Sequence, residues 1–292
     1  MKASGTELSA DNAASLRRVG EERVKEIDGV SLCYWELPRG PHYLVLLHGN
    51  SLCKEAFYHQ FEGLAESDWS LLAIDLPGHG ASADASDADR QYTIPGYADL
   101  VWKLLDALEI ERPAVLGWSL GGNIALELAG RDADISGIML VGTPPVGPGT
   151  QHFADAFQEK ALTSPAMQGD APAEAMLEFL EDAVGPLDPM PACFADAAIR
   201  ADGRAREIMG AHWAAGTEGY DQMSVIAQWH APIACMIGAE DALARIDFLE
   251  NAHWRNLWND QLCVLPGCGH APFLHDPDRF NTLLHSFLDS LG

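Results

Sequence analysis

The sequence predicts an α/β protein with a mostly parallel, eight-stranded sheet, helices on both faces and an inserted helical segment. Three observations support this fold class. Short apolar runs alternate with segments whose apolar residues recur at helical spacing. The alternation stops over residues 144–229, which are rich in Ala, Pro, Asp and Glu, and then resumes. With 292 residues, of which 48% are hydrophobic, the chain can bury a large core.

The expected strands and helices follow one another along the chain. The pattern predicts strands over residues 23–29, 30–38, 42–49, 69–78, 113–119, 135–142, 232–241 and 261–270. It predicts helices over residues 92–110, 120–131 and 277–292. In the first helix the apolar residues at helical spacing are Leu100, Leu104, Leu105 and Leu108. Strands that alternate with helices indicate a mostly parallel sheet covered on both faces.

The break in this alternation divides the chain into three parts. We expect one core formed by residues 1–143 and 230–292, with residues 144–229 inserted as a helical cap. Ligands of α/β folds bind beyond the C-terminal ends of the parallel strands. The cap is therefore expected to lie over those ends and to help select the substrate.

Net charge limits the classes of partner. A formal charge of −25 repels nucleic acid and anionic lipid. The acidic residues are dispersed, which favours a role in solubility over recognition of neutral or cationic substrates. No run of 18 apolar residues occurs, and the first 20 residues lack the apolar segment of a signal peptide. We expect no membrane insertion, and a monomer or a homodimer.

The cysteine pattern argues against a metal site and against disulfides. The six cysteines form no CxxC pair and show no Cys/His spacing typical of zinc. Several lie in apolar runs, as Cys235 does in PIACMIG. We therefore expect reduced core thiols in a cytoplasmic protein that needs no cofactor.

Ser119 is the candidate nucleophile. It lies in Gly117-Trp118-Ser119-Leu120-Gly121, which fits the pattern G-x-S-x-G between an expected buried strand and an amphipathic helix. In that context the serine occupies a tight, strained turn that presents its oxygen above the sheet. The flanking glycines are required because neighbouring backbone crowds them. A turn without catalytic function is the alternative.

His270 is the candidate base, because a serine needs a base that is held by a third group. It follows the last expected strand in VLPGCGHAPFLHDP, where a loop can reach back to Ser119. His275, five residues later, is the alternative, and its place near the final helix favours a surface position. His48 precedes Gly49 in a different loop, which we expect it to brace.

The candidate acid follows the preceding strand, in CMIGAEDALARIDF. Asp241 is preferred because the turn at the strand end would carry it beside His270. Glu240 remains an alternative, whereas Asp247 is typical of the beginning of a helix.

The expected oxyanion hole combines two backbone N–H groups, from the residue after the nucleophile and from the loop after the third strand. Here these residues are Leu120 and Asn50. Asn50 also has a side-chain amide that could reach a substrate carbonyl, and its alternative role is that of a turn former. DLPGHGAS, residues 75–82, is interpreted as architecture.

Together these motifs resemble the α/β-hydrolase fold with a cap. LLHGNS, DLPGHGAS, DRQYTIPGYAD, GWSLGG, GTPPV, DGRAREIM and GHAPF resemble the metal-independent N-acyl-homoserine lactonases of this fold, which open the lactone ring of quorum-sensing signals. The resemblance implies quorum quenching with Ser119 as nucleophile, His270 as base and Asp241 as acid. It also implies that Asn50 and Leu120 bind the oxyanion.

The chain departs from that family at two places. The family's acid can be a glutamate, where this chain has Asp241. A tyrosine of the family's cap can place its hydroxyl at the substrate, and the matching residue here is Phe179, which has no hydroxyl. Apolar cap residues are expected to hold an acyl chain or to pack the cap: Met176, Leu177, Phe179 and Leu180. Trp118 is expected either to line the substrate pocket or to pack in the core.

Other activities share the same triad. A general carboxylesterase differs only in the shape of its pocket, and carbon–carbon bond hydrolases, cofactor-free haloperoxidases and perhydrolases use a similar elbow. Dehalogenases and epoxide hydrolases are disfavoured because they need an aspartate at the position of Ser119. A ligand receptor on the same fold would bind a small ester or lactone with little turnover.

Overall fold

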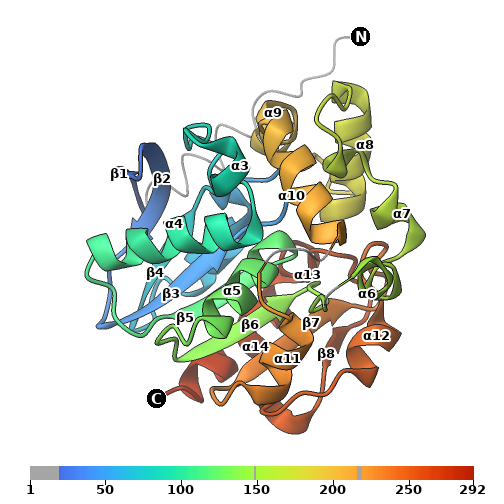
Figure 1. The fold of residues 1–292 in the computed structure, drawn as a ribbon. Helices are drawn as coiled ribbons and strands as arrows, with labels where there is room; N and C mark the ends of the chain where they lie inside the picture. The colour runs from blue at the N-terminus through green and yellow to red at the C-terminus, as the bar shows by residue number, and fades with distance from the viewer. Residues whose placement is uncertain (1–19, 148, 216–218) are drawn as a thin grey trace.

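One sheet organises the protein. The computed structural model describes residues 20–147, 149–215 and 219–292 (Figure 1). Within these ranges eight strands form a single sheet in the order β1-β2-β4-β3-β5-β6-β7-β8. β2 pairs antiparallel with β1 and β4, and all other pairs are parallel. The strands are β1 Glu21–Ile27, β2 Val30–Leu37, β3 His42–Leu47, β4 Trp69–Ile74, β5 Ala114–Trp118, β6 Gly137–Val141, β7 Ile233–Gly238 and β8 Cys263–Leu265. This confirms the fold class that the sequence predicts.

The central strands of the sheet are buried on both faces, which explains why they are continuous apolar runs. In β3, Leu44 and Leu46 belong to one core cluster, whereas Val45 and Leu47 belong to the other. The first cluster contains residues of α2, α13 and α14, and the second contains residues of α4, α5 and α11. The core helices and short 3₁₀ turns are η1 Lys54–Phe57, α2 Tyr58–Gly63, α3 Ala88–Gln91, α4 Ile94–Ala107, α5 Leu120–Gly130, α11 Gln222–Gln228, α12 Ile246–Asn251, η3 Trp258–Asp260, α13 Pro272–His275 and α14 Pro277–Asp289.

The helix expected over residues 92–110 shows why its sequence forms a helix there. The hydroxyl of Thr93 caps the first turn by accepting a hydrogen bond from the N–H of Gly96, at 3.1 Å. Pro95 lies in that turn, where its missing N–H costs no helical hydrogen bond. Leu100 and Leu104 are fully buried against the sheet. α4 therefore begins and ends within three residues of the expected bounds.

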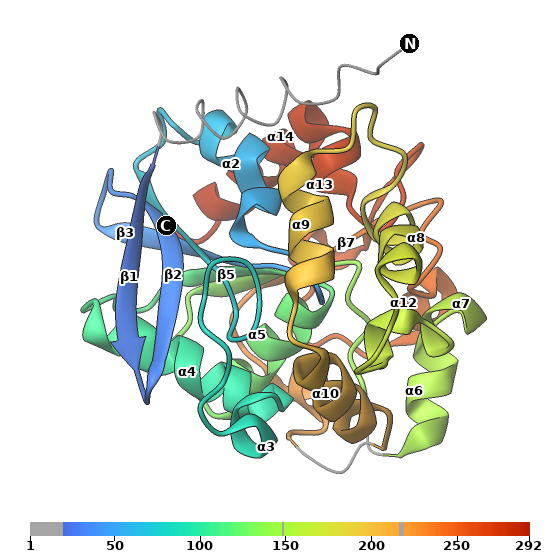
Figure 2. The ribbon, with the colours of Figure 1, turned by 90° about the horizontal axis from the view of Figure 1, so that it is seen from above.

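The described residues between β6 and β7 form helices joined by loops and add no strand to the sheet. In Figures 1 and 2 they spread over one end of the sheet. The segments are α6 Thr150–Ala156, α7 Glu159–Leu162, η2 Pro165–Met167, α8 Ala173–Val184, α9 Ala192–Arg200 and α10 Gly203–Ala215, followed by α11. Arg200 donates hydrogen bonds to the carbonyl oxygens of Gly78 and Ser82, and the N–H of Asp202 bonds to Gly78. These helices are thus attached to the loop that leaves the C-terminal end of β4.

The last helix of this segment, α11, packs on the core. Buried Gln222 accepts a hydrogen bond from the side chain of Asn123 in α5, at 2.7 Å, and donates one to the Asn123 carbonyl. Ile226 lies in the same cluster as α4 and α5. The chain therefore re-enters the core layer before β7 begins.

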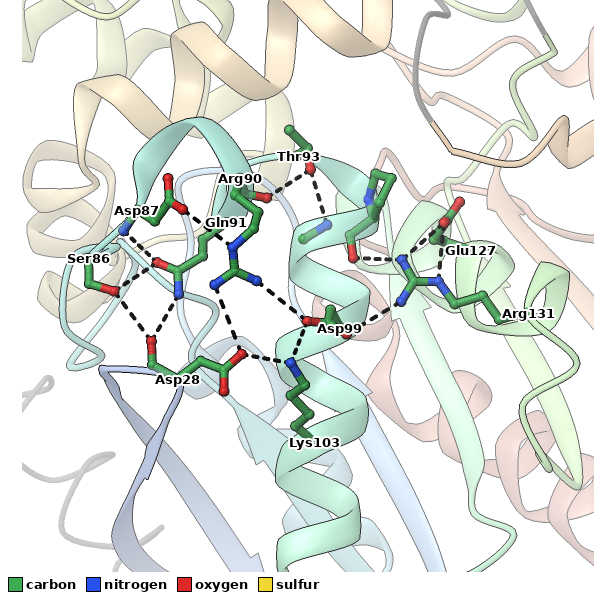
Figure 3. Close-up of polar contacts among 12 residues, drawn as sticks. Asp28, Ser86, Asp87, Arg90, Gln91, Thr93, Asp99, Lys103, Glu127 and Arg131 are labelled. Carbon is green, nitrogen blue, oxygen red and sulfur yellow. Dashed lines mark hydrogen bonds and ion pairs between the residues drawn. The ribbon is translucent and has the colours of Figure 1, made fainter.

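A network of charged side chains connects three parts of one face (Figure 3). Lys103 of α4 contacts Asp28 in the β1–β2 turn and Asp99 one helical turn away, at 2.7 and 2.8 Å. Arg131, which follows α5, pairs with Glu127 at 3.2 Å. The pairs of Lys103 are half-exposed and contribute little to stability, whereas the carboxylate of Glu127 is buried where it faces Arg131.

Two further properties concern the described residues alone. No helix in them has the length and the apolar character that crossing a membrane requires. They hold no group of three or more His, Cys, Asp or Glu side chains placed to bind a metal ion. Residues 1–19, in which the sequence predicts no signal peptide, lie outside the described part of the chain.

Candidate active site

Ser119 occupies the turn between β5 and α5 in a backbone conformation that few residues adopt. Its φ is 52° and its ψ is −117°. Neighbouring groups hold this strained turn: the N–H of Ser119 bonds to Val141 at 2.9 Å, and its carbonyl accepts from the Thr143 hydroxyl at 3.1 Å. The strain is thus offset by fixed contacts, as is typical of a functional residue.

The glycines around Ser119 are required by close backbone contacts. A Cβ at Gly117 would lie 2.4 Å from the carbonyl oxygen of Gly121. A Cβ at Gly121 would lie 2.0 Å from the carbonyl oxygen of Leu47 in β3. Both distances are far below van der Waals contact. The helix can therefore start this close to the sheet only if residues 117 and 121 have no side chain.

His270 and Asp241 form a buried pair. The two carboxylate oxygens of Asp241 lie 3.0 and 2.9 Å from Nδ1 of His270. The same carboxylate accepts hydrogen bonds from the N–H groups of Leu243 and Ala244, at 2.8 and 2.9 Å. A carboxylate can only accept hydrogen bonds, so Nδ1 of His270 must be the donor. Nε2 is then the nitrogen of the ring that can accept a proton.

The residues at the C-terminal end of β6 contact both the backbone of Ser119 and the ring of His270. Val141 accepts the N–H of Ser119, and a Cβ on the next residue, Gly142, would lie 2.8 Å from Nδ1 of His270. From the other side, the indole N–H of Trp118 donates to the carbonyl of His270 at 2.9 Å. Ser119 and His270 are therefore both attached to the backbone at the C-terminal ends of β5 and β6.

Leu120 and Asn50 lie at the positions expected for oxyanion donors. Leu120 opens α5, so its N–H has no acceptor within the helix. Asn50 follows β3 and is 9% exposed. Its side-chain amide donates to the carbonyl of Ala166 in η2 at 2.7 Å. One amide proton of Asn50 is thus used to hold the helical segment, and its backbone N–H is the oxyanion candidate.

Comparisons with known proteins show the family to which the chain belongs. Residues 43–277 match the profile of the alpha/beta hydrolase fold. The chain belongs to the α/β-hydrolase fold family. It is 32% identical to the N-acyl homoserine lactonase AidH, solved with N-butanoyl homoserine, with a TM-score of 0.87 over 93% of this chain and 97% of that one.

Two further relatives of this hydrolase are esterases. The pimeloyl-[acyl-carrier protein] methyl ester esterase of Neisseria meningitidis is 28% identical over 273 residues, 87% of this chain and 96% of the relative. An esterase from Exiguobacterium antarcticum is 19% identical, with a TM-score of 0.77 over 92% of this chain and 99% of that one, and it shows the shared fold alone. The family, together with the similarity to AidH and to the Neisseria esterase, establishes the hydrolase as an enzyme that cleaves ester or lactone bonds.

The loops below the site of this hydrolase are held by buried polar groups. His48 donates from Nδ1 to the Gly49 carbonyl at 2.7 Å and accepts the N–H of Leu76 at Nε2, at 3.0 Å. Burial lowers the pKa of His48 to about 4, so the ring is neutral at pH 7. These contacts match the bracing role expected from the sequence. The sequence contains no comparable signal for Lys54, whose buried ammonium lies 2.9 Å from the carboxylate of Asp75.

The remaining candidates have different surroundings. Glu240 is exposed, and Asp247 lies in the first turn of α12, where it pairs with Arg245. The surface position expected for His275 is wrong: its ring is partly buried between the His270 loop and α8, because the single turn of α13 directs it inward.

The apolar candidates also separate by burial. Trp118 is 1% exposed and packs edge-on against Phe273, so its observed environment is the core. Phe179 and Met176 of α8 belong to the same cluster. Leu177 is 38% exposed and does not share their buried side of the helix.

Proposed function

We propose that this hydrolase opens the lactone ring of N-acyl-homoserine lactones and thereby quenches quorum-sensing signals. The similarity to AidH carries the proposal, because it spans nearly the whole of both chains. The buried His270–Asp241 pair beside the strained Ser119 supports a serine mechanism.

In the proposed reaction His270 removes the proton of Ser119 through Nε2 as the serine oxygen attacks the lactone carbonyl. Asp241 fixes the imidazole tautomer and stabilises the imidazolium. The N–H groups of Asn50 and Leu120 bind the oxyanion, and losing one such donor typically costs about 3–4 kcal/mol of barrier.

The tetrahedral intermediate then collapses as the ring C–O bond breaks. His270 returns its proton to the leaving oxygen, which stays attached to the acyl-enzyme as the homoserine hydroxyl. His270 next takes a proton from water, which attacks the ester of Ser119. His270 returns this proton to the Ser119 oxygen as the acyl bond breaks, which releases N-acyl-homoserine and restores the enzyme without a metal or a cofactor.

We propose residues 144–229 as the cap that selects the substrate. Phe179 and Met176 of α8 are the residues proposed to contact the acyl chain, with Leu180 beside them on the buried side of the helix. Trp118 is proposed to hold the His270 loop in place through the hydrogen bond of its indole N–H.

A carboxylesterase is the second candidate, favoured by the Neisseria relative. The charge of the cap favours a free substrate over one that is attached to an anionic carrier protein. Residues 144–229 hold thirteen Asp and Glu but four Lys and Arg. The four cations contact groups of this protein: Lys160, Arg200, Arg204 and Arg206. Such a surface repels an anionic carrier and leaves a small neutral lactone unaffected.

The test is to incubate the purified protein and a chelator with N-butanoyl-, N-hexanoyl- and N-dodecanoyl-homoserine lactone. Mass spectrometry detects a product one water heavier. Lactones also open in base, so Ser119→Ala is run at the same pH, with Ser290→Ala as a matched serine variant far from the elbow. We expect product from the wild type and Ser290→Ala only.

The other outcomes separate the alternatives. Cleavage of p-nitrophenyl butyrate without ring opening would favour the carboxylesterase. A single burst without further turnover would favour the receptor. Unchanged turnover in Ser119→Ala would exclude the serine mechanism.

A further inference from the structure

His275 connects two parts of the protein through opposite nitrogens of one ring. Its Nδ1 lies 2.9 Å from the N–H of Gly269, and its Nε2 lies 2.7 Å from the carbonyl oxygen of Val184. A backbone N–H can only donate, so Nδ1 carries no proton and Nε2 donates to Val184. The ring is therefore held as one neutral tautomer by both partners.

The two partners lie at functionally different places. Gly269 immediately precedes His270, the candidate base. Val184 is the last residue of α8, the helix proposed to contact the acyl chain, and is 91 residues from His275 in sequence. The fit is close, because a Cβ at Gly185 would lie 2.1 Å from Nε2 of His275.

We propose that His275 is a positioning residue that fixes the His270 loop against the C-terminal end of α8. The inference rests on the proposed catalytic role of His270. A base that is displaced by about 1 Å can lose roughly a hundredfold in rate, so the hydrogen bond to Gly269 is where the effect on catalysis arises. The bond to Val184 makes the position of the loop depend on the cap.

A purely structural role is the competing explanation. The last carbonyls of any helix need a donor, and His275 supplies one to α8. That role requires only Nε2 and would affect stability and the fit of long acyl chains. It would not affect the turnover of an acetyl ester, whose acyl group is too short to use the cap.

The experiment therefore measures kcat and KM for p-nitrophenyl acetate and p-nitrophenyl hexanoate in three variants of His275. His275→Phe removes both hydrogen bonds, and His275→Asn is too short to span both partners. His275→Gln keeps one acceptor and one donor. His285→Phe is the matched control, because His285 contacts only the carbonyl of Gly63 among the contacts described, at 3.1 Å. Circular dichroism melts report folding.

We expect kcat for the acetate to fall at least about tenfold in His275→Phe and by a smaller factor in His275→Asn. In His275→Gln it should stay within about threefold of the wild type, and His285→Phe should match the wild type. The inference would be overturned if kcat for the acetate in folded His275→Phe stayed within twofold of the wild type. If His275→Phe does not fold, the same criterion applies to His275→Asn. Equal losses in the Gln and Phe variants would overturn it as well. If the wild type cleaves the acetate but opens no lactone, the lactonase proposal fails and this test still holds.

Discussion

The carboxylate of Asp241 lies within 3.0 Å of Nδ1 of His270, although 29 residues separate them in sequence. The Asp241 side chain is fully buried, and the N–H groups of Leu243 and Ala244 hold one of its oxygens. These contacts fix the carboxylate and, through it, the orientation of the imidazole of His270.

The first prediction concerns the identity of the acid. Asp241→Asn should keep the shape of the site but reverse the tautomer of His270, lowering kcat for p-nitrophenyl butyrate by about 10⁴-fold. Glu240→Gln is the matched control, since its exposed side chain leaves turnover unchanged. A large loss in Glu240→Gln with activity retained in Asp241→Asn would assign the acid to Glu240.

The second prediction concerns the glycine after the nucleophile. Gly121→Ala places a methyl group 2.0 Å from the Leu47 carbonyl and should lower the free energy of unfolding by about 1–3 kcal/mol, with loss of activity. Gly210→Ala in α10 meets only the side chain of Met167, at 3.1 Å, and should be neutral or stabilising. Urea denaturation measures both variants. Equal stability of Gly121→Ala and the wild type would contradict the close packing of α5 on β3.

The third prediction compares a buried with an exposed cation. The carboxylate of Asp75 is fully buried and contacts Lys54, so Lys54→Met leaves it without a counter-charge. We expect a loss of about 3–5 kcal/mol in the free energy of unfolding. Lys103→Met removes a half-exposed cation and should cost at most about 1 kcal/mol. Similar losses in the two variants would show that Asp75 does not depend on Lys54.

The fourth prediction concerns stability in acid. Burial lowers the pKa of His48 from 6.5 to about 4, and burial also lowers that of His79 to about 3. Between about pH 6.5 and 4 the unfolded chain therefore binds more protons at His48 than the folded protein does. The free energy of unfolding must fall as pH drops through this window, with about 3 kcal/mol arising from His48.

Denaturation from pH 7 to 4 tests this assignment. His48→Gln should flatten the dependence of the free energy of unfolding on pH, whatever its effect at pH 7. His230→Gln, at an exposed histidine, should leave the slope as in the wild type. An unchanged slope in His48→Gln would mean that His48 titrates alike in both states.

The order of the strands and helices along the chain, and the turn that holds Ser119, can be predicted from the amino-acid pattern alone. Both depend on neighbours in the chain: apolar periodicity distinguishes strand from helix, and a serine between glycines at a strand end produces the strained turn. The same local pattern predicts Asn50 in the loop after β3 and Leu120 at the start of the helix after Ser119.

Contacts between side chains that are far apart in the sequence cannot be predicted in this way, because they depend on how distant elements pack. Asp241 and Glu240 are adjacent acids, and the turn after β7, packed against the His270 loop, buries one and exposes the other. His275 joins the His270 loop to Val184 because α8 lies over α13, a contact that no pattern near residue 275 contains. Periodicity reports the burial of a residue along its own element, whereas partners from distant elements are brought together by packing.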